Sequence, residues 1–99
     1  MLTSKERARL RGLANELPVI IQVGKGGISD NLVRQIDEAL EARELVKLRL
    51  LQNVEEEPEE MAETLANLTQ AEVVQVIGKV IVLYRPAKDN QNKGGIADL

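Results

Sequence analysis

Hydrophobic positions recur along this chain with two different spacings, and the changes between them predict seven secondary-structure elements. In three segments the apolar residues return every three or four positions, as they do on one face of an α-helix. Four short segments rich in Val, Ile and Leu have the pattern of β-strands. The predicted helices cover residues 4–16, 29–43 and 58–68, and the predicted strands cover residues 19–23, 45–50, 73–77 and 80–84.

The predicted helices begin and end at residues that suit those positions. Thr3 and Glu6 have the spacing of a capping box, in which each side chain accepts a hydrogen bond from the other residue's backbone N–H group. Ser29 is a candidate N-cap for the second helix, and Pro58 suits the first position of the third. Pro18 ends the first helix, because proline lacks the N–H group that would continue it.

The element order αβαβαββ predicts an α/β fold of the two-layer α+β kind. Two strand–helix–strand units with right-handed crossovers would precede an antiparallel hairpin, giving a mixed four-stranded sheet. The hairpin loop Gly78-Lys79 has glycine first, which is typical of a type II′ turn. The helices are expected to cover one face and to leave Lys47 and Arg49 in water on the other. Residues 1–86 are predicted to form the domain, and the polar residues 87–99 a flexible tail.

The composition excludes several classes of function. The chain has 99 residues without Cys or His, so a Ser-His-Asp or Cys-His site, a disulfide and a Cys-based zinc site cannot form. Tyr84 is the only aromatic residue, which argues against an RNA-binding surface of stacked aromatic rings. We expect that the protein is not an enzyme and that it binds no metal, cofactor or small-molecule substrate. A small hydrolase with a Lys- or carboxylate-based site stays open as an alternative.

The chain also lacks features of membrane and secreted proteins. No apolar run approaches the roughly 20 residues of a membrane span. No signal peptide is recognisable at the N-terminus, which goes directly into a charged helical pattern. A cytoplasmic protein is therefore expected.

The glycine-rich segment between the first strand and the second helix is the most informative motif. Gly24, Lys25, Gly26 and Gly27 have the G-x-x-G spacing that KH domains use to hold nucleic-acid backbone. Glycines allow a ligand to approach the backbone closely, and the following helix start favours an anion. The spacing fits neither a Walker loop nor a dinucleotide fingerprint. The alternative is a tight strand-to-helix turn that binds nothing.

Basic residues are concentrated in the first half of the chain, despite the net charge of −3. Residues 1–50 hold nine basic and seven acidic side chains, whereas residues 51–99 hold four and nine. An acidic protein can still present a basic face to nucleic acid. Besides the loop, the candidate RNA-binding residues are Lys5, Arg7, Arg11, Lys47, Arg49, Lys79 and Arg85. The alternative is that these are solvated surface charges, some of them paired.

An acidic stretch at residues 55–63 precedes and opens the third helix. Calcium loops need oxygen ligands at set spacings around a glycine turn, and the stretch has neither. The favoured interpretation is a helix N-terminus complemented by negative charge. A face turned away from RNA is a further interpretation that the sequence leaves open.

Four segments of the chain carry a family resemblance, namely residues 10–14 (LRGLA), 24–27 (GKGG), 39–48 (ALEARELVKL) and 76–86 (VIGKVIVLYRP). Together they resemble the bacterial CRM-domain (chloroplast RNA splicing and ribosome maturation) family in its single-domain YhbY type. The resemblance implies a fold like the C-terminal domain of bacterial translation initiation factor three. It also implies an RNA-binding protein that associates with precursors of the large ribosomal subunit (pre-50S) and contacts RNA through its G-x-x-G loop. The alternative is a ribosome-associated protein–protein interaction module in which this loop is only a turn.

Overall fold

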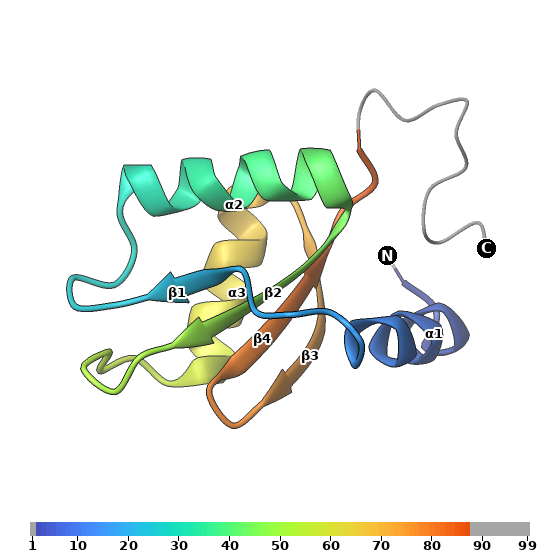
Figure 1. The fold of residues 1–99 in the computed structure, drawn as a ribbon, viewed down its shortest axis with the longest axis horizontal. Helices are drawn as coiled ribbons and strands as arrows, with labels where there is room; N and C mark the ends of the chain where they lie inside the picture. Colours follow the sequence, from blue (N-terminus) through green and yellow to red (C-terminus); the bar gives the residue numbers. More distant parts are fainter. Residues whose placement is uncertain (1, 88–99) are drawn as a thin grey trace.

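A computed structural model describes residues 2–87 and confirms the predicted order αβαβαββ (Figure 1). The elements are α1 (Ser4–Ala14), β1 (Ile21–Val23), α2 (Asp30–Arg43), β2 (Leu45–Leu50), α3 (Pro58–Thr69), β3 (Glu72–Ile77) and β4 (Val80–Tyr84). Helix α1 ends at Ala14 rather than at residue 16, and strand β1 begins at Ile21 rather than at residue 19. Except for Ala87, the predicted tail lies outside the described residues.

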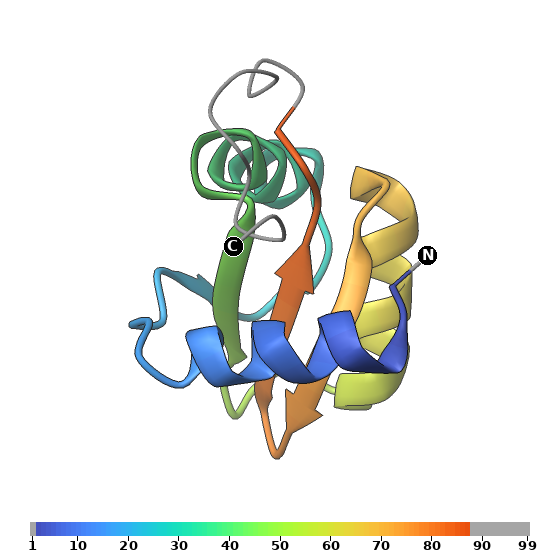
Figure 2. The same cartoon turned by 90° about the vertical axis from the view of Figure 1, so that its right-hand side faces the viewer.

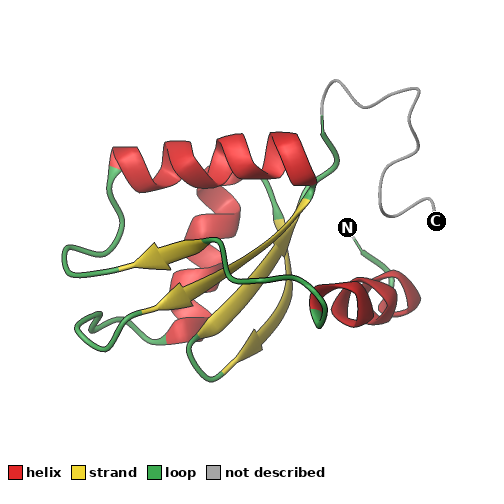
Figure 3. Ribbon diagram, in the orientation of Figure 1, coloured by secondary structure: helices red, strands yellow, loops and turns green. Residues whose placement is uncertain are grey.

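The four strands form one mixed sheet in the order β1-β2-β4-β3 (Figure 3). Strands β1 and β2 are parallel, with Val23 opposite Leu50, and the other two pairs are antiparallel. The predicted α/β fold with a mixed sheet is therefore confirmed. Gly78, first in the β3–β4 loop, has φ of 56°, the positive value that a type II′ turn requires at this position.

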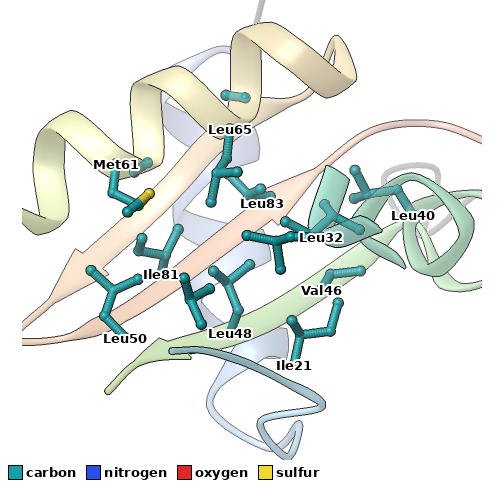
Figure 4. Close-up of a cluster of buried hydrophobic side chains, with 14 of the residues drawn as sticks. Ile21, Leu32, Leu40, Val46, Leu48, Leu50, Met61, Leu65, Ile81 and Leu83 are labelled. Carbon is teal, nitrogen blue, oxygen red and sulfur yellow. The ribbon is translucent and has the colours of Figure 1, made fainter. Parts of the chain in front are cut away.

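The main hydrophobic core lies between the sheet and the helices α2 and α3 (Figure 4). Leu48 and Ile81 from the sheet, Ile36 and Leu40 from α2 and Leu65 from α3 are completely buried there. Each fully buried side chain of this size contributes about 1.5–3 kcal/mol relative to an exposed one. This layer fixes the ends of β1 and β2 relative to the N-termini of α2 and α3.

Helix α1 lies on the opposite face of the sheet, where it crosses β2, β4 and β3 (Figure 2). Its buried residues Leu10 and Ala14 pack with Leu45, Val82 and Tyr84 in a second apolar cluster. The expectation that all helices cover one face was therefore wrong. The continuous apolar run of β4 was the signal in the sequence, because only a strand covered on both faces buries consecutive residues in this way.

Candidate nucleic-acid interface

The G-x-x-G segment forms a tight loop between the end of β1 and the start of α2. The N–H group of Gly27 donates to the carbonyl oxygen of Gly24 (3.1 Å), which closes the turn. Gly26 and Gly27 have φ values of 99° and 60°, in the left-handed region that glycine adopts without a steric cost. Ser29 is the N-cap of α2, as predicted, and its Oγ accepts from the N–H group of Leu32 (3.1 Å). The local sequence therefore determines this backbone shape.

The loop presents backbone donors and one exposed cation. Within residues 2–87, no protein acceptor takes the N–H groups of Lys25 and Gly26. Donors of this kind beside a helix N-terminus can bind a phosphate oxygen. The Lys25 side chain is exposed and adds a mobile positive charge, whereas Asp30 places a negative charge in the first turn of α2.

An open cleft of about 1050 Å³ lies between this loop and the loop that joins β2 to α3. One wall consists of Lys25, Gly26 and Gly27. The other wall is the segment from Gln52 to Glu56, here called the β2–α3 wall. Because β1 and β2 are parallel, the loops that follow them meet at the same edge of the sheet (Figure 1). The second wall was not predicted from the sequence, although the parallel pairing implied by the strand–helix–strand units was a signal for it.

The acidic stretch therefore does not turn away from the candidate site as a whole. Glu55 and Glu56 line the cleft opposite Lys25. Glu59 and Glu60 lie in the first turn of α3, where they complement the helix dipole as predicted. The first two glutamates of the stretch therefore lie across the cleft from the candidate RNA-binding loop.

Two further candidate cations lie at the same end of the sheet as the G-x-x-G loop. Arg49 is the penultimate residue of β2, between Gln22 of β1 and Val80 of β4, and its side chain is exposed as predicted. Lys79 is also exposed, and its carbonyl oxygen accepts from the N–H group of Leu50, the last residue of β2 (2.8 Å). With Lys25, these residues form a group of three exposed cations, here called the loop-end cations.

The candidate residues of α1 lie elsewhere. Figures 1 and 2 place α1 and the β1–α2 loop at opposite ends of the molecule, so Lys5, Arg7 and Arg11 are separated from the cleft. Arg7 also has a structural contact, since its Nε donates to the carbonyl oxygen of Val73 (3.3 Å) and joins α1 to β3. The structure therefore does not bring the basic residues of α1 and the G-x-x-G loop into one patch.

Lys47 was expected to lie in water on an uncovered face, and this was wrong. Its side chain is half-buried under α1. Its Nζ donates to the carbonyl oxygens of Ala14 (3.2 Å) and Leu17 (3.3 Å). A cation at these carbonyls complements the negative end of the α1 dipole. Lys47 therefore stabilises the C-terminus of α1, and its donors are directed into the protein.

Arg85 is buried in an ion-pair network, rather than exposed at the end of β4. Its Nη1 lies 2.6 Å from Oδ1 of Asp37 and 2.8 Å from the carbonyl oxygen of Thr69. Its Nη2 is 3.3 Å from Oε1 of Glu41, the next acidic residue on the same face of α2. The guanidinium joins α2, the end of α3 and the end of β4, so Arg85 has a structural role and lies outside the candidate interface.

Metal-binding clusters, membrane-spanning helices and exposed aromatic rings are absent from residues 2–87. Between residues 2 and 87, no group of three Asp or Glu side chains is placed to hold a metal ion. Nor is any helix in this range long and apolar enough to cross a bilayer. Tyr84 is buried against α1, which removes the only aromatic ring from the surface.

Comparison with known proteins assigns the chain to a family. A sequence model of the CRS1 / YhbY (CRM) domain matches residues 2–85. A Bacillus subtilis (strain 168) protein named "Probable RNA-binding protein YqeI" is 50% identical over 91 residues, which cover 92% of this chain and 95% of the relative. A Haemophilus influenzae protein named "RNA-binding protein" is 31% identical over 88 residues, 89% of each chain.

Similarity to a solved structure agrees with this assignment. The solution structure of the Staphylococcus aureus protein SAV1595 matches with a TM-score of 0.78 and 50% identity, and the match covers 92% of this chain and 95% of that one. The family match runs through α1, the G-x-x-G loop and the end of β4, the same segments that carry the resemblance in the sequence. The chain therefore belongs to the CRS1 / YhbY (CRM) domain family.

Proposed function

We propose that this protein is a non-enzymatic RNA-binding protein that holds RNA backbone at the G-x-x-G loop. The observation that carries the proposal is the cleft beside Lys25, Gly26 and Gly27, in a chain whose relatives are named RNA-binding proteins. The N–H groups of Lys25 and Gly26 would donate to phosphate oxygens, and the Lys25 ammonium would approach the same phosphate.

In this proposal the loop-end cations provide the electrostatic part of the RNA affinity. Arg49 and Lys79 are exposed at the edge of the sheet where the β1–α2 loop begins. Each cation that neutralises a phosphate releases counterions, so affinity falls as salt is added. With three such cations, we expect a slope of log Kobs against log salt of about −2 for single-stranded RNA.

Affinity for RNA would rest on contacts to the backbone and on shape, without stacking of bases on aromatic rings. Sequence-specific RNA binding by stacking needs exposed aromatic rings, and Tyr84, the only aromatic residue in the chain, is buried. The finer role follows the family resemblance: we propose that the RNA is ribosomal RNA in precursors of the large subunit, in the cytoplasm. The second candidate function is a ribosome-associated protein–protein interaction module, in which the same loop is only a turn.

The test compares two substitutions that change the charge equally at opposite ends of the molecule. Lys25→Asp reverses a charge in the cleft, and Lys5→Asp does so on α1. Filter-binding titrations against ribosomal RNA fragments at two salt concentrations measure the affinity. We expect Lys25→Asp to weaken binding at least tenfold, about 1.4 kcal/mol, and Lys5→Asp to weaken it much less. Equal effects, or no RNA binding at low salt, would favour the protein-interaction module.

A crosslinking map would test the finer proposal. The protein is crosslinked to ribosomal precursors, and the crosslinked nucleotides and residues are identified. Crosslinks from the residues that line the cleft to large-subunit precursor RNA are expected. Crosslinks to proteins alone would contradict the proposal.

A further inference from the structure

Glu56 holds a carboxylate against the G-x-x-G loop from the opposite side of the cleft. A Cβ atom built on Gly27 would lie 3.2 Å from Oε2 of Glu56 and 3.6 Å from Oε1, so both carboxylate oxygens lie next to this glycine. Glu56 is otherwise exposed and lies on the β2–α3 wall. An anionic group thus lies beside the loop that is proposed to receive phosphate.

A carboxylate at this position has opposite effects on the two parts of an RNA chain. It repels backbone phosphate on its own side of the cleft, because like charges at short range disfavour each other. It accepts hydrogen bonds from the amino and imino groups of bases, as Asp and Glu do when they contact the cytosine amino group. Gln52 and Asn53, also exposed on the β2–α3 wall, carry amide groups that can both donate and accept.

We infer that Glu56 is a specificity-determining residue of the cleft. Its carboxylate excludes phosphate from the β2–α3 wall, so that RNA lies with its phosphates toward Lys25 and its base edges toward Glu56. This inference rests on the proposed function and names its substrate class, single-stranded RNA, because only unpaired bases present their Watson–Crick edges to a protein. A polyanion without bases meets the repulsion and gains no compensating contact.

The experiment compares two ligands and two matched variants. The ligands are an unstructured single-stranded RNA oligonucleotide and inorganic polyphosphate of similar charge. The variants are Glu56→Gln and, as the control, Glu63→Gln, which removes the same charge from an exposed position on α3. Both side chains are exposed, so thermal melts of the two variants should match that of the parent. Competition binding at one fixed salt concentration gives the affinities.

We expect Glu56→Gln to raise the affinity for polyphosphate about fivefold and to change the affinity for RNA by less than about twofold, so that discrimination between them falls. Glu63→Gln should raise both affinities by the same small factor, through the change in net charge alone. Equal behaviour of the two variants would overturn the inference. An equal gain for RNA and polyphosphate in Glu56→Gln would also overturn it, because the carboxylate would then act only as a general repulsive charge.

The outcome separates this inference from the proposed function. If Lys25→Asp leaves RNA binding by the parent protein unchanged, the proposed function is wrong. The polyphosphate comparison still tests Glu56 in that case. A gain specific to Glu56→Gln would support phosphate exclusion from the β2–α3 wall, and the lack of such a gain would contradict it.

Discussion

Arg85 Nη1 lies 2.6 Å from Asp37 Oδ1, which ties the end of β4 to the middle of α2. The side chain of Arg85 is 9% exposed and that of Asp37 is 55% exposed, so one partner of the pair is buried and the other faces water. Replacing the buried residue of an ion pair lowers the stability of the fold more than replacing the exposed one, because the polar groups around the buried residue lose their hydrogen-bond partner. The two residues should therefore differ in their effect on stability.

We expect Arg85→Ala to lower the free energy of unfolding by about 2–3 kcal/mol, since the carbonyl oxygen of Thr69 also loses its donor. Asp37→Asn should cost less than about 1 kcal/mol, as for other solvent-screened pairs. Urea denaturation of both variants measures the difference. RNA affinity of the folded protein should not change in either variant. A stable Arg85→Ala protein that has lost RNA binding would show instead that Arg85 takes part in the RNA interface.

Lys47 and Arg49 lie on the same face of β2, and the structure gives them different roles. Lys47→Ala should lower the free energy of unfolding by about 1 kcal/mol, because the C-terminal carbonyls of α1 lose their cation. Arg49→Ala should change stability by less than about 0.5 kcal/mol, since its side chain is exposed.

For RNA binding the order of the two variants should be reversed, so that Arg49→Ala has the larger effect. Arg49→Ala should make the salt slope about 0.7 shallower, and Lys47→Ala should leave it unchanged. Denaturation curves and salt titrations on the same preparations give both measurements. If Lys47→Ala flattened the slope and Arg49→Ala did not, the interface would lie under α1.

Gln70 and Glu44 both have positive φ at helix C-termini, with values of 59° and 68°. Such a conformation costs a residue with a side chain about 1–2 kcal/mol, and glycine avoids most of this cost. Gln70 is exposed, so Gln70→Gly should raise the free energy of unfolding by about 0.5–1 kcal/mol. Glu44→Gly should not be stabilising, because the Glu44 carboxylate accepts from the N–H group of Ala87 (2.7 Å). Equal stabilisation by both substitutions would show that this hydrogen bond has little energetic effect.

The capping box of α1 should make stability depend on pH. The Glu6 carboxylate accepts from the Thr3 N–H group (2.9 Å), and this hydrogen bond, with that from the Thr3 side chain, lowers the pKa of Glu6. Because folding lowers this pKa, the ionised carboxylate stabilises the fold above its ordinary pKa. That stabilisation is lost as the pH falls through the lowered value.

The matched variant for this prediction is Glu6→Gln, which keeps an acceptor at this position but does not titrate. The stability difference between the parent and Glu6→Gln should shrink as the pH falls from about 5 to 3. Thermal melts over this range measure it. A difference that stays constant would show that Glu6 does not contribute through its charge.

Truncation after Lys88 tests the proposed division into a domain and a tail. This cut keeps every described contact, including the hydrogen bond from Ala87 to Glu44, so the melting temperature and RNA affinity should stay the same. Truncation after Pro86 removes that hydrogen bond and should lower stability by about 1 kcal/mol, or about 4–8 °C in melting temperature. A drop of several degrees for the longer fragment would mean that residues 89–99 stabilise the domain.

Local patterns in the sequence were sufficient to predict most of the secondary structure and the order of its elements. The Thr3–Glu6 capping box, the Ser29 cap and the boundaries of β2 all follow from neighbouring residues, and the structure confirms them. Such features depend on interactions within a few residues, which periodicity and capping rules describe well.

The basic residues were harder to place, because their partners are distant in sequence. Lys47 donates to carbonyl oxygens at the end of α1 and just after it, and Arg85 is bound by side chains of α2. Alternation in β2 placed Lys47 on the correct face, but it could not show that α1 covers that face. The same limit applies to Glu56, whose nearness to Gly27 depends on the meeting of two loops.

The charged residues of this protein fall into two groups, those that connect elements of the fold and those that are exposed beside the cleft. Arg7, Lys47 and Arg85 hold elements of the fold together, whereas the loop-end cations and Glu56 have exposed side chains beside the β1–α2 and β2–α3 loops. Functional residues are often kept at a cost in stability, so that stability and function trade off against each other. We expect the loop-end cations and Glu56 to be replaceable with little change in the free energy of unfolding, because their side chains are exposed. The ligand preference should therefore be adjustable at these positions, by evolution or by design, with little effect on thermal stability.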